Sequence, residues 1–304
     1  MWGILDTLNP HVVQLPARLN MEDLFAFVGR VVDEHADVRS SAIVFDFAKL
    51  AFIEPVGIVV LCNLIEYLGQ AGVKVTFRHH KVDRGCLRYL DDCRFFERYL
   101  KRQLFDGSKE RVGTVPLQLI AHDKAFEYLS FRLIPWVGQI VGLSKESLDS
   151  MRACLEEIFH NVKDHSGVGI GCAFAQYYEA KSEIQIAVSD FGRGIPNLVR
   201  TVLPHINDRD ALKQAAIEGF TTKSNVQNRG AGLPNLIKFT TRLGGNVLIA
   251  SGRGELVASP RPDGYKLTAR HSSDVYPGTL VRVILRTQSL KTIATDTEEE
   301  NFTW

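Results

Sequence analysis

The chain has 304 residues, which is long for one average domain and about right for two. Hydrophobic residues make up 45% and charged residues 23%, a composition typical of soluble globular proteins and unlike disordered ones. The formal net charge of +1 gives no general reason to expect a nucleic acid or an anionic membrane as partner. Five cysteines without a CxxC pair favour a reduced compartment, and neither a signal peptide nor a membrane-length apolar run is present. We therefore expect a cytoplasmic protein.

Strand-like and helix-like segments alternate from residue 11 to about residue 106. Strands are predicted at "HVVQLP", "SAIVFDFA" and "VKVTF". Helices are predicted at "NMEDLFAFVGRVVDEH", where Asn20 is a suitable N-cap, at "VGIVVLCNLIEYLGQAG", closed by Gly72, and at "CLRYLDDCRFFERYLKRQL". This alternation predicts a small α/β domain over residues 1–110, and the polar stretch "FDGSKERVGT" predicts a boundary after it.

The second half is richer in helices first and in strands later. A strand at "VPLQLIA" precedes helices at "FEYLSFRLIPWVGQIV" and "GLSKESLDSMRACLEEIFHNVKDHS", with Ser144 as N-cap of the latter. "GCAFAQYYEA" and "SEIQIAVSDFG" predict a hairpin, and "GAGLPNLIKFTTRLGG" predicts a helix. Four short strands follow at "NVLIASG", "ELVASP", "GYKLTAR" and "GTLVRVILR". We expect an α+β sandwich over residues 114–287, with helices on one face of a mixed or antiparallel sheet, and a polar tail over residues 288–304.

A row of polar side chains accompanies the apolar stripe of the helix that follows Ser144. The stripe consists of Leu148, Met151, Leu155, Ile158 and Val162, at steps of three and four. At about 100° per residue, one sector roughly a third of a turn away holds Glu157, Asn161, Asp164 and His165. Taken alone, this row fits a solvated flank equally well. Cys154 and His160 do not share the sector, and we interpret them as packing or surface residues.

Two glycine motifs follow this helix. In "VSDFGRGIP", Asp190 ends an apolar strand and is followed by Gly192 and Gly194, which let a ligand approach the backbone closely. In "RGAGLPNLIKF", Gly230 and Gly232 stand directly before a helix, where free backbone N–H groups favour a phosphate. Either motif alone is weak evidence, because a tight turn explains it as well.

Together, and in this order, the three features resemble the GHKL ATPase superfamily of gyrase, heat-shock chaperones, histidine kinases and MutL. Residues 157–165 resemble its N box, residues 190–194 its first glycine box and residues 230–233 its second. "PGTLVRVIL" resembles the closing strand of that fold, with Thr279 where the family has a threonine near the adenine. The resemblance spans roughly residues 114–287 and implies the Bergerat type of α+β sandwich.

The resemblance assigns roles to individual residues. It implies that Asn161 holds the Mg²⁺ that bridges the phosphates and that Glu157 orients or deprotonates the attacking water. It implies that Asp190 accepts the adenine N6 hydrogen bond while the glycines beside it make room for the base. The full set implied to contact the nucleotide is Asn161, Asp164, His165, Asp190, Gly192, Gly194, Ile195, Lys223, Arg229, Gly230, Gly232, Leu233 and Thr279.

Other nucleotide motifs are absent from the sequence or misplaced. No Walker sequence GxxxxGK[ST] occurs. "GVGIG" at residues 167–171 follows a helix rather than a strand, which disfavours a dinucleotide loop. Residues 196–229 would form the ATP lid, in which "GFTTKSNVQNRG" resembles the Phe-Thr-Thr-Lys stretch of some histidine kinases. Lys223 and Arg229 are then cations for the phosphates, and a solvated charged loop is an equal alternative.

The first half resembles a STAS domain, the fold of anti-sigma-factor antagonists, although a small βαβ unit has a similar pattern. In that family a serine before a glycine is phosphorylated by a GHKL partner kinase. Here the loop is "IEPVG", and Val56 stands before Gly57. Because valine has no hydroxyl, that phosphorylation switch cannot operate at this position.

The sequence favours hydrolysis over phosphotransfer without settling the choice. No histidine lies in the His-Glu/Asp followed by Pro pattern of a phosphoacceptor helix. Asp164 resembles gyrase and MutL, whereas His165 and "GAGL" are kinase-like. We expect a Mg-ATP-binding GHKL protein that switches a protein interaction with slow hydrolysis. The alternatives are an anti-sigma-type serine/threonine kinase acting on a STAS partner and a non-catalytic nucleotide-gated scaffold; the partner is unidentified, and a homodimer stays open.

Overall fold

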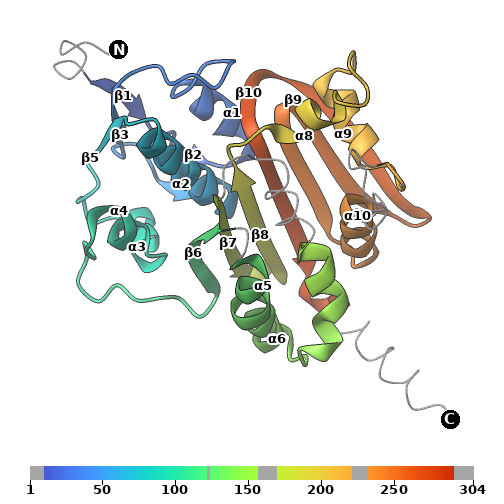
Figure 1. Cartoon of the computed structure of the whole chain (residues 1–304). Helices are drawn as coiled ribbons and strands as arrows, with labels where there is room; N and C mark the ends of the chain where they lie inside the picture. Colours follow the sequence, from blue (N-terminus) through green and yellow to red (C-terminus); the bar gives the residue numbers. More distant parts are fainter. Residues whose placement is uncertain (1–9, 122–123, 157–169, 221–231, 291–304) are drawn as a thin grey trace.

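The structure is a computed structural model that describes residues 10–121, 124–156, 170–220 and 232–290 (Figure 1). Its first half contains, in chain order, β1 (His11–Gln14), β2 (Arg18–Leu19), α1 (Met21–Gly29), β3 (Ala42–Asp46), β4 (Phe52–Ile53), α2 (Pro55–Gln70), β5 (Lys74–Arg78), α3 (Gly85–Asp92) and α4 (Phe95–Leu100). Strands β1, β3 and β5 form a parallel sheet in the order β1-β3-β5. The predicted alternation of strands and helices in this half is confirmed.

The ends of the helices follow local chemistry. The Asn20 side chain accepts hydrogen bonds from the N–H groups of Glu22 and Asp23, so α1 begins where the N-cap predicts. Gly72 has a φ of 72° directly after α2, a left-handed conformation that glycine adopts without strain. The single helix expected over residues 86–104 is two helices, because Arg94 between α3 and α4 has a φ of 65°.

The second half begins with β6 (Thr114–Ala121), α5 (Ala125–Tyr128), the π-helix η3 (Leu129–Leu133), α6 (Ile134–Val141) and the 3-10 helix η4 (Glu146–Leu148). It continues with β7 (Ile170–Tyr178), the 3-10 helix η5 (Glu179–Lys181), β8 (Glu183–Asp190), α8 (Gly194–Val199) and α9 (Asp208–Ala215). It ends with α10 (Gly232–Arg242), β9 (Asn246–Arg261) and β10 (Gly264–Arg286). Residues 149–156 are also helical. The five strands form one antiparallel sheet in the order β6-β7-β8-β10-β9. The predicted hairpin of β7 and β8 is confirmed.

The four short strands predicted near the C-terminus are two long ones. Strands β9 and β10 pair along most of their length, and the register shifts between His271 and Thr279. Gly252, opposite this irregularity, has a φ of 58°. Gly252, which ends the first of the four predicted strands, therefore lies at a β-bulge, which bends a strand without ending it.

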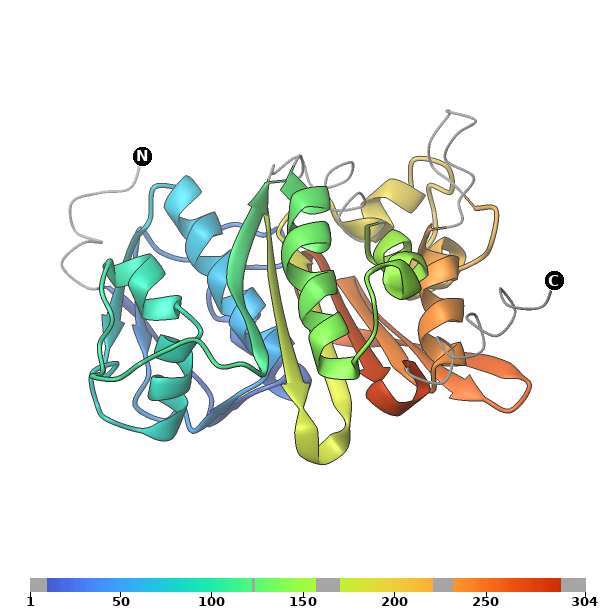
Figure 2. The ribbon, with the colours of Figure 1, turned by 90° about the horizontal axis from the view of Figure 1, so that it is seen from below.

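Both faces of the five-stranded sheet are covered, whereas the sequence predicts helices on one face. On one side of the sheet lie α5, α6, α10 and the helix at residues 149–156 (Figure 2). The core between them contains residues such as Leu133, Leu155 and Val188. On the other side lie α1 and α2 of the first half (Figure 1). Residues of the sheet such as Phe174 and Tyr276 share a core with them. The helix α2 thus lies between the two sheets.

The expected domain boundary is a hydrogen-bonded connection. The buried carboxylate of Asp91 in α3 accepts hydrogen bonds from the N–H groups of Leu104 and Phe105, both at 2.9 Å, and from the Ser108 hydroxyl at 2.7 Å. Two main-chain N–H groups and one serine hydroxyl of this connection therefore tie it to α3. Across the described ranges, no helix is long and apolar enough to span a bilayer.

Candidate functional site

Asp190 ends β8 and directs its carboxylate to the helical side of the sheet. Along β8, Ile184, Ile186 and Val188 belong to the helical core, while Ala187 belongs to the core shared with the first half. Successive side chains in a strand alternate between faces, so Asp190 shares the face of Val188. The residue is buried, and the N–H of Gly192 donates to its Oδ1 at 2.8 Å.

Burial dominates the acidity of this carboxyl group. It raises the pKa of Asp190 to about 7, while the main-chain N–H groups of Gly192 and Thr279 act in the opposite direction. A carboxylate has about four acceptor positions. Within the described residues its recorded hydrogen bonds are those two, so the ionised form has capacity for a further donor.

Thr279 lies opposite Asp190, as its pair in the register of β8 and β10. Its neighbour Gly278, which the sequence reasoning missed, allows this close approach. Gly278 has a φ of 112°, and a Cβ there would lie 2.2 Å from the Asp190 carbonyl oxygen and 2.7 Å from the Gly192 nitrogen. The signal was present in "PGTL", directly before the threonine.

Gly194 is required by packing against the protein itself. It has a φ of 72°, and a Cβ would lie 2.7 Å from Ser251 Oγ. Ser251 accepts a hydrogen bond from the Ile195 N–H at 3.0 Å and donates one to the Gly278 carbonyl. The resemblance implies that Gly194 makes room for a base. In the structure, Ser251 fills the space beside this glycine. No sequence motif marks Ser251, because β9 brings it to the loop only in the folded chain.

The whole predicted polar row, which is Glu157, Asn161, Asp164 and His165, lies outside the described residues. Three further predicted nucleotide contacts also lie outside them: Lys223, Arg229 and Gly230. The helix that leads to the row is confirmed, since Leu148, Met151 and Leu155 are buried and Ser144 Oγ accepts the Ser147 N–H at 3.3 Å. In the second glycine box, Gly232 begins α10, and half-buried Leu233 packs against the helical core.

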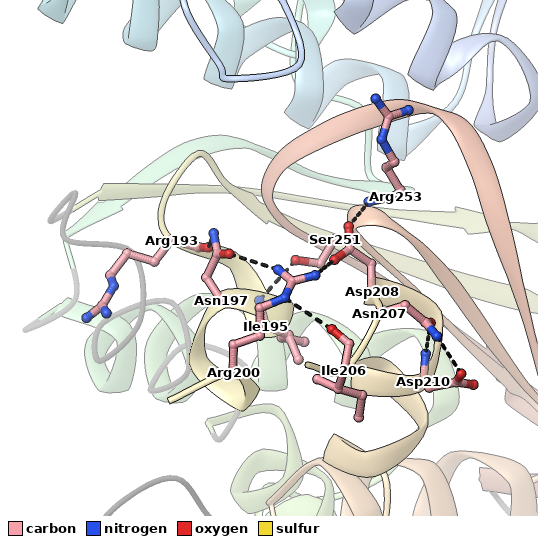
Figure 3. Close-up of polar contacts among 10 residues, drawn as sticks. All are labelled: Arg193, Ile195, Asn197, Arg200, Ile206, Asn207, Asp208, Asp210, Ser251 and Arg253. Carbon is pink, nitrogen blue, oxygen red and sulfur yellow. Dashed lines mark hydrogen bonds and ion pairs between the residues drawn. The ribbon is translucent and has the colours of Figure 1, made fainter. Parts of the chain in front are cut away.

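The first part of the expected lid is packed helical structure. Leu198 and Val199 of α8 are buried, as is Leu212 of α9. Asp208 fastens α9 to the bulge of β9, because its carboxylate accepts the Arg253 N–H at 2.6 Å and pairs with the Arg200 guanidinium (Figure 3). The part of the expected lid formed by α8 and α9 is therefore packed helix, and its role as a lid stays a prediction.

Behind the glycine loop lies a cavity of about 620 Å³ that both halves of the chain line. Residues 34–36, after α1, form part of its wall, and Gly192 and Gly194 form another part. An ion pair of 2.9 Å between Arg253 Nη2 and Glu34 Oε2 joins the two halves at this cavity. Arg193 is exposed and points away from the Arg200 cluster (Figure 3).

The loop "IEPVG", for which the sequence suggested a resemblance to the STAS phosphorylation site, is closed by packing. Val56 is fully buried in the first turn of α2. A Cβ at Gly57 would lie 2.4 Å from the Leu19 carbonyl oxygen, so glycine is needed for contact with β2.

Cys154 is partly buried against the helical core. Among the residues that the structure describes, no cluster of His, Cys, Asp and Glu could hold a metal ion.

No family model matches the chain, and no curated protein matches it. Among solved structures, part of the chain is similar to the ATPase region of Saccharomyces cerevisiae topoisomerase II, at 12% sequence identity and a TM-score of 0.24. The match covers 38% of this chain and 32% of that one. A likeness this distant establishes neither a shared fold nor a shared activity.

Proposed function

We propose that the protein binds Mg-ATP in the manner of the GHKL superfamily and uses the nucleotide to switch a protein interaction, with slow hydrolysis. The observation that carries the proposal is the buried carboxylate of Asp190, a residue that pairs with Thr279 across the sheet and whose main-chain carbonyl is approached closely by Gly278. A buried acid with spare acceptor capacity suits recognition of an exocyclic amino group such as the adenine N6.

The remaining roles come from the motifs of the sequence. Asn161 would hold Mg²⁺ together with the phosphates, and the metal would neutralise phosphate charge during hydrolysis. Glu157, one helical turn earlier, would orient or deprotonate the attacking water. The N-terminus of α10, which begins at Gly232, would offer backbone N–H groups to the phosphates. The STAS-like first half would be the interaction domain.

Calorimetric titration with ADP tests the nucleotide site. We expect wild-type protein to bind ADP and ATP and Asp190→Asn to bind both more than tenfold more weakly. Loss of a charged hydrogen-bond acceptor costs about 1.5 to 3 kcal/mol. Asp46→Asn is the matched control, since Asp46 is a buried carboxylate of the first half, bonded to His79. Equal affinity in wild type and Asp190→Asn would remove Asp190 from the site.

Two substitutions in the polar row separate binding from chemistry. Glu157→Ala should retain Mg-ATP but lose turnover about a hundredfold or more, the range of a positioned general base. Asn161→Ala should lose the Mg-dependent part of ATP affinity and leave metal-free ADP binding comparatively unaffected. If the row is a solvated flank, both variants will handle nucleotide like wild type. Normal hydrolysis in Glu157→Ala would exclude that residue as the base.

Incubation with ATP labelled at the γ-phosphate, alone and with cell lysate, tests hydrolysis against transfer. We expect the label in free phosphate. Labelled protein would instead support the anti-sigma-type kinase, and absence of both products with retained binding would support the scaffold.

A further inference from the structure

The residue before Asp190 is held by the first half of the chain. Ser189 is fully buried, and its Oγ accepts a hydrogen bond from Asn63 Nδ2 of α2 at 2.6 Å. The same hydroxyl shares a hydrogen bond with the hydroxyl of Tyr276 in β10, which is also fully buried. These three side chains come from α2, β8 and β10, so they join the two halves through one network.

The residue after Asp190 is held by the same helix. The Phe191 ring packs edge-to-face on Tyr67 of α2, with centroids 5.7 Å apart, and on Tyr276, with centroids 5.4 Å apart. Asn63 and Tyr67 are four residues apart and therefore lie on one face of α2. The Tyr67 hydroxyl donates to the Ala36 carbonyl at 2.6 Å, which anchors the helix to the turn after α1.

Because side chains alternate along β8, the contacts of Ser189 and Phe191 with α2 also position Asp190, which lies between them. Ser189 and Phe191 point into the core shared with α2, while the carboxylate between them points to the helical side. Any displacement of α2 therefore moves the main chain that carries Asp190. Because a buried hydrogen-bond network favours one arrangement of its members, this contact fixes where the carboxylate lies.

We propose that Asn63 and Ser189 are positioning residues for purine nucleotide recognition by Asp190, so that the first half sets nucleotide affinity through α2. This inference rests on the proposed nucleotide site. It gives the STAS-like half a role that needs no phosphorylation at Val56: a partner that shifts α2 changes the geometry of the acceptor for the base.

The test compares Asn63→Ala and Ser189→Ala with Cys62→Ala. Cys62 is the fully buried neighbour of Asn63 in α2, so its truncation removes buried volume from the same helix and leaves the hydrogen bond between Asn63 and Ser189 in place. We expect both network variants to bind ADP about fivefold more weakly than wild type, the effect of one neutral hydrogen bond. Cys62→Ala should bind like wild type. Combined with Asp190→Asn, Asn63→Ala should add little further loss, because both changes act through one carboxylate.

A second readout needs no nucleotide. The Gly192 N–H, which donates to Asp190, should exchange with solvent faster in Asn63→Ala than in Cys62→Ala, because the loop is held less firmly. If wild type fails to bind ADP but this amide still responds, the proposed function fails and the positioning stands. If ADP binds equally to wild type and both network variants, the inference is overturned. An amide that does not respond, together with no ADP binding, overturns both.

Discussion

Asp190 combines an ordinary side chain with an environment that favours its neutral form. Its folded-state pKa of about 7 lies above the ordinary aspartate value of 3.8, so the folded protein binds the proton more tightly than the unfolded chain. The stability from this group is fully present below pH 3.8 and is lost as the pH rises through 7. As the pH rises from 4 to 8, the unfolding free energy of Asp190→Asn should therefore increase relative to that of wild type by roughly 2 to 4 kcal/mol. Urea unfolding at several pH values measures this.

The stability contributed by Asp46 should depend on pH in the opposite direction, which the same urea experiment can measure. Burial alone would raise its pKa, but hydrogen bonds from His79 and from the Ala48 N–H outweigh burial and lower it. Its stabilising effect is present above the unfolded pKa and is lost as the pH falls. Asp46→Asn should thus be destabilised from pH 8 down to about pH 5, and the deficit should shrink only below about pH 4, as the pH falls through the lowered folded pKa. A parallel trend in the two variants would contradict the environment described for Asp190.

At the scale of elements, α9 is fixed to β9 by one carboxylate. Asp208 approaches Gly252 so closely that a Cβ there would lie 2.4 Å from Oδ2, and it bonds both the Arg253 N–H and the Arg200 guanidinium. Asp208→Ala leaves these donors without their acceptor, which should cost about 1 to 3 kcal/mol of stability. Asp210→Ala, on the same helix but paired at the surface with Arg209, should change stability little. Denaturation midpoints of both variants decide whether α9 is a fixed element or part of a lid.

At the scale of the molecule, the two halves share one core and should unfold together. The core contains Phe45 of the first half together with Phe174 and Phe191 of the second. We predict that Trp136 fluorescence and hydrogen exchange of the α2 amides report the same unfolding free energy. Phe191→Ala should lower both by about 3 to 5 kcal/mol, since a large buried ring is lost. Independent transitions for the two halves would contradict a shared core.

Local features of the chain could be predicted from the order of its residues. Asn20 and Ser144 marked helix starts, the spacing of Leu148, Met151 and Leu155 marked a buried stripe, and the alternation in the first half marked an α/β unit. These signals depend on residues a few positions apart, which is why a pattern in one chain reveals them. The glycine motif that follows Asp190 is likewise a local signal, because its residues are only a few positions apart.

The contacts between segments that are far apart in the chain became visible only in the folded structure. Ser251 and Gly278 reach the glycine loop from β9 and β10, and Asn63 reaches Ser189 across 126 residues of sequence. Patterning along the chain could not show that the second face of the five-stranded sheet is covered by α2, because a buried strand is apolar whichever element buries it. The two long strands were likewise hidden, since a glycine at a β-bulge and a glycine at a turn look alike until the partner strand is in place.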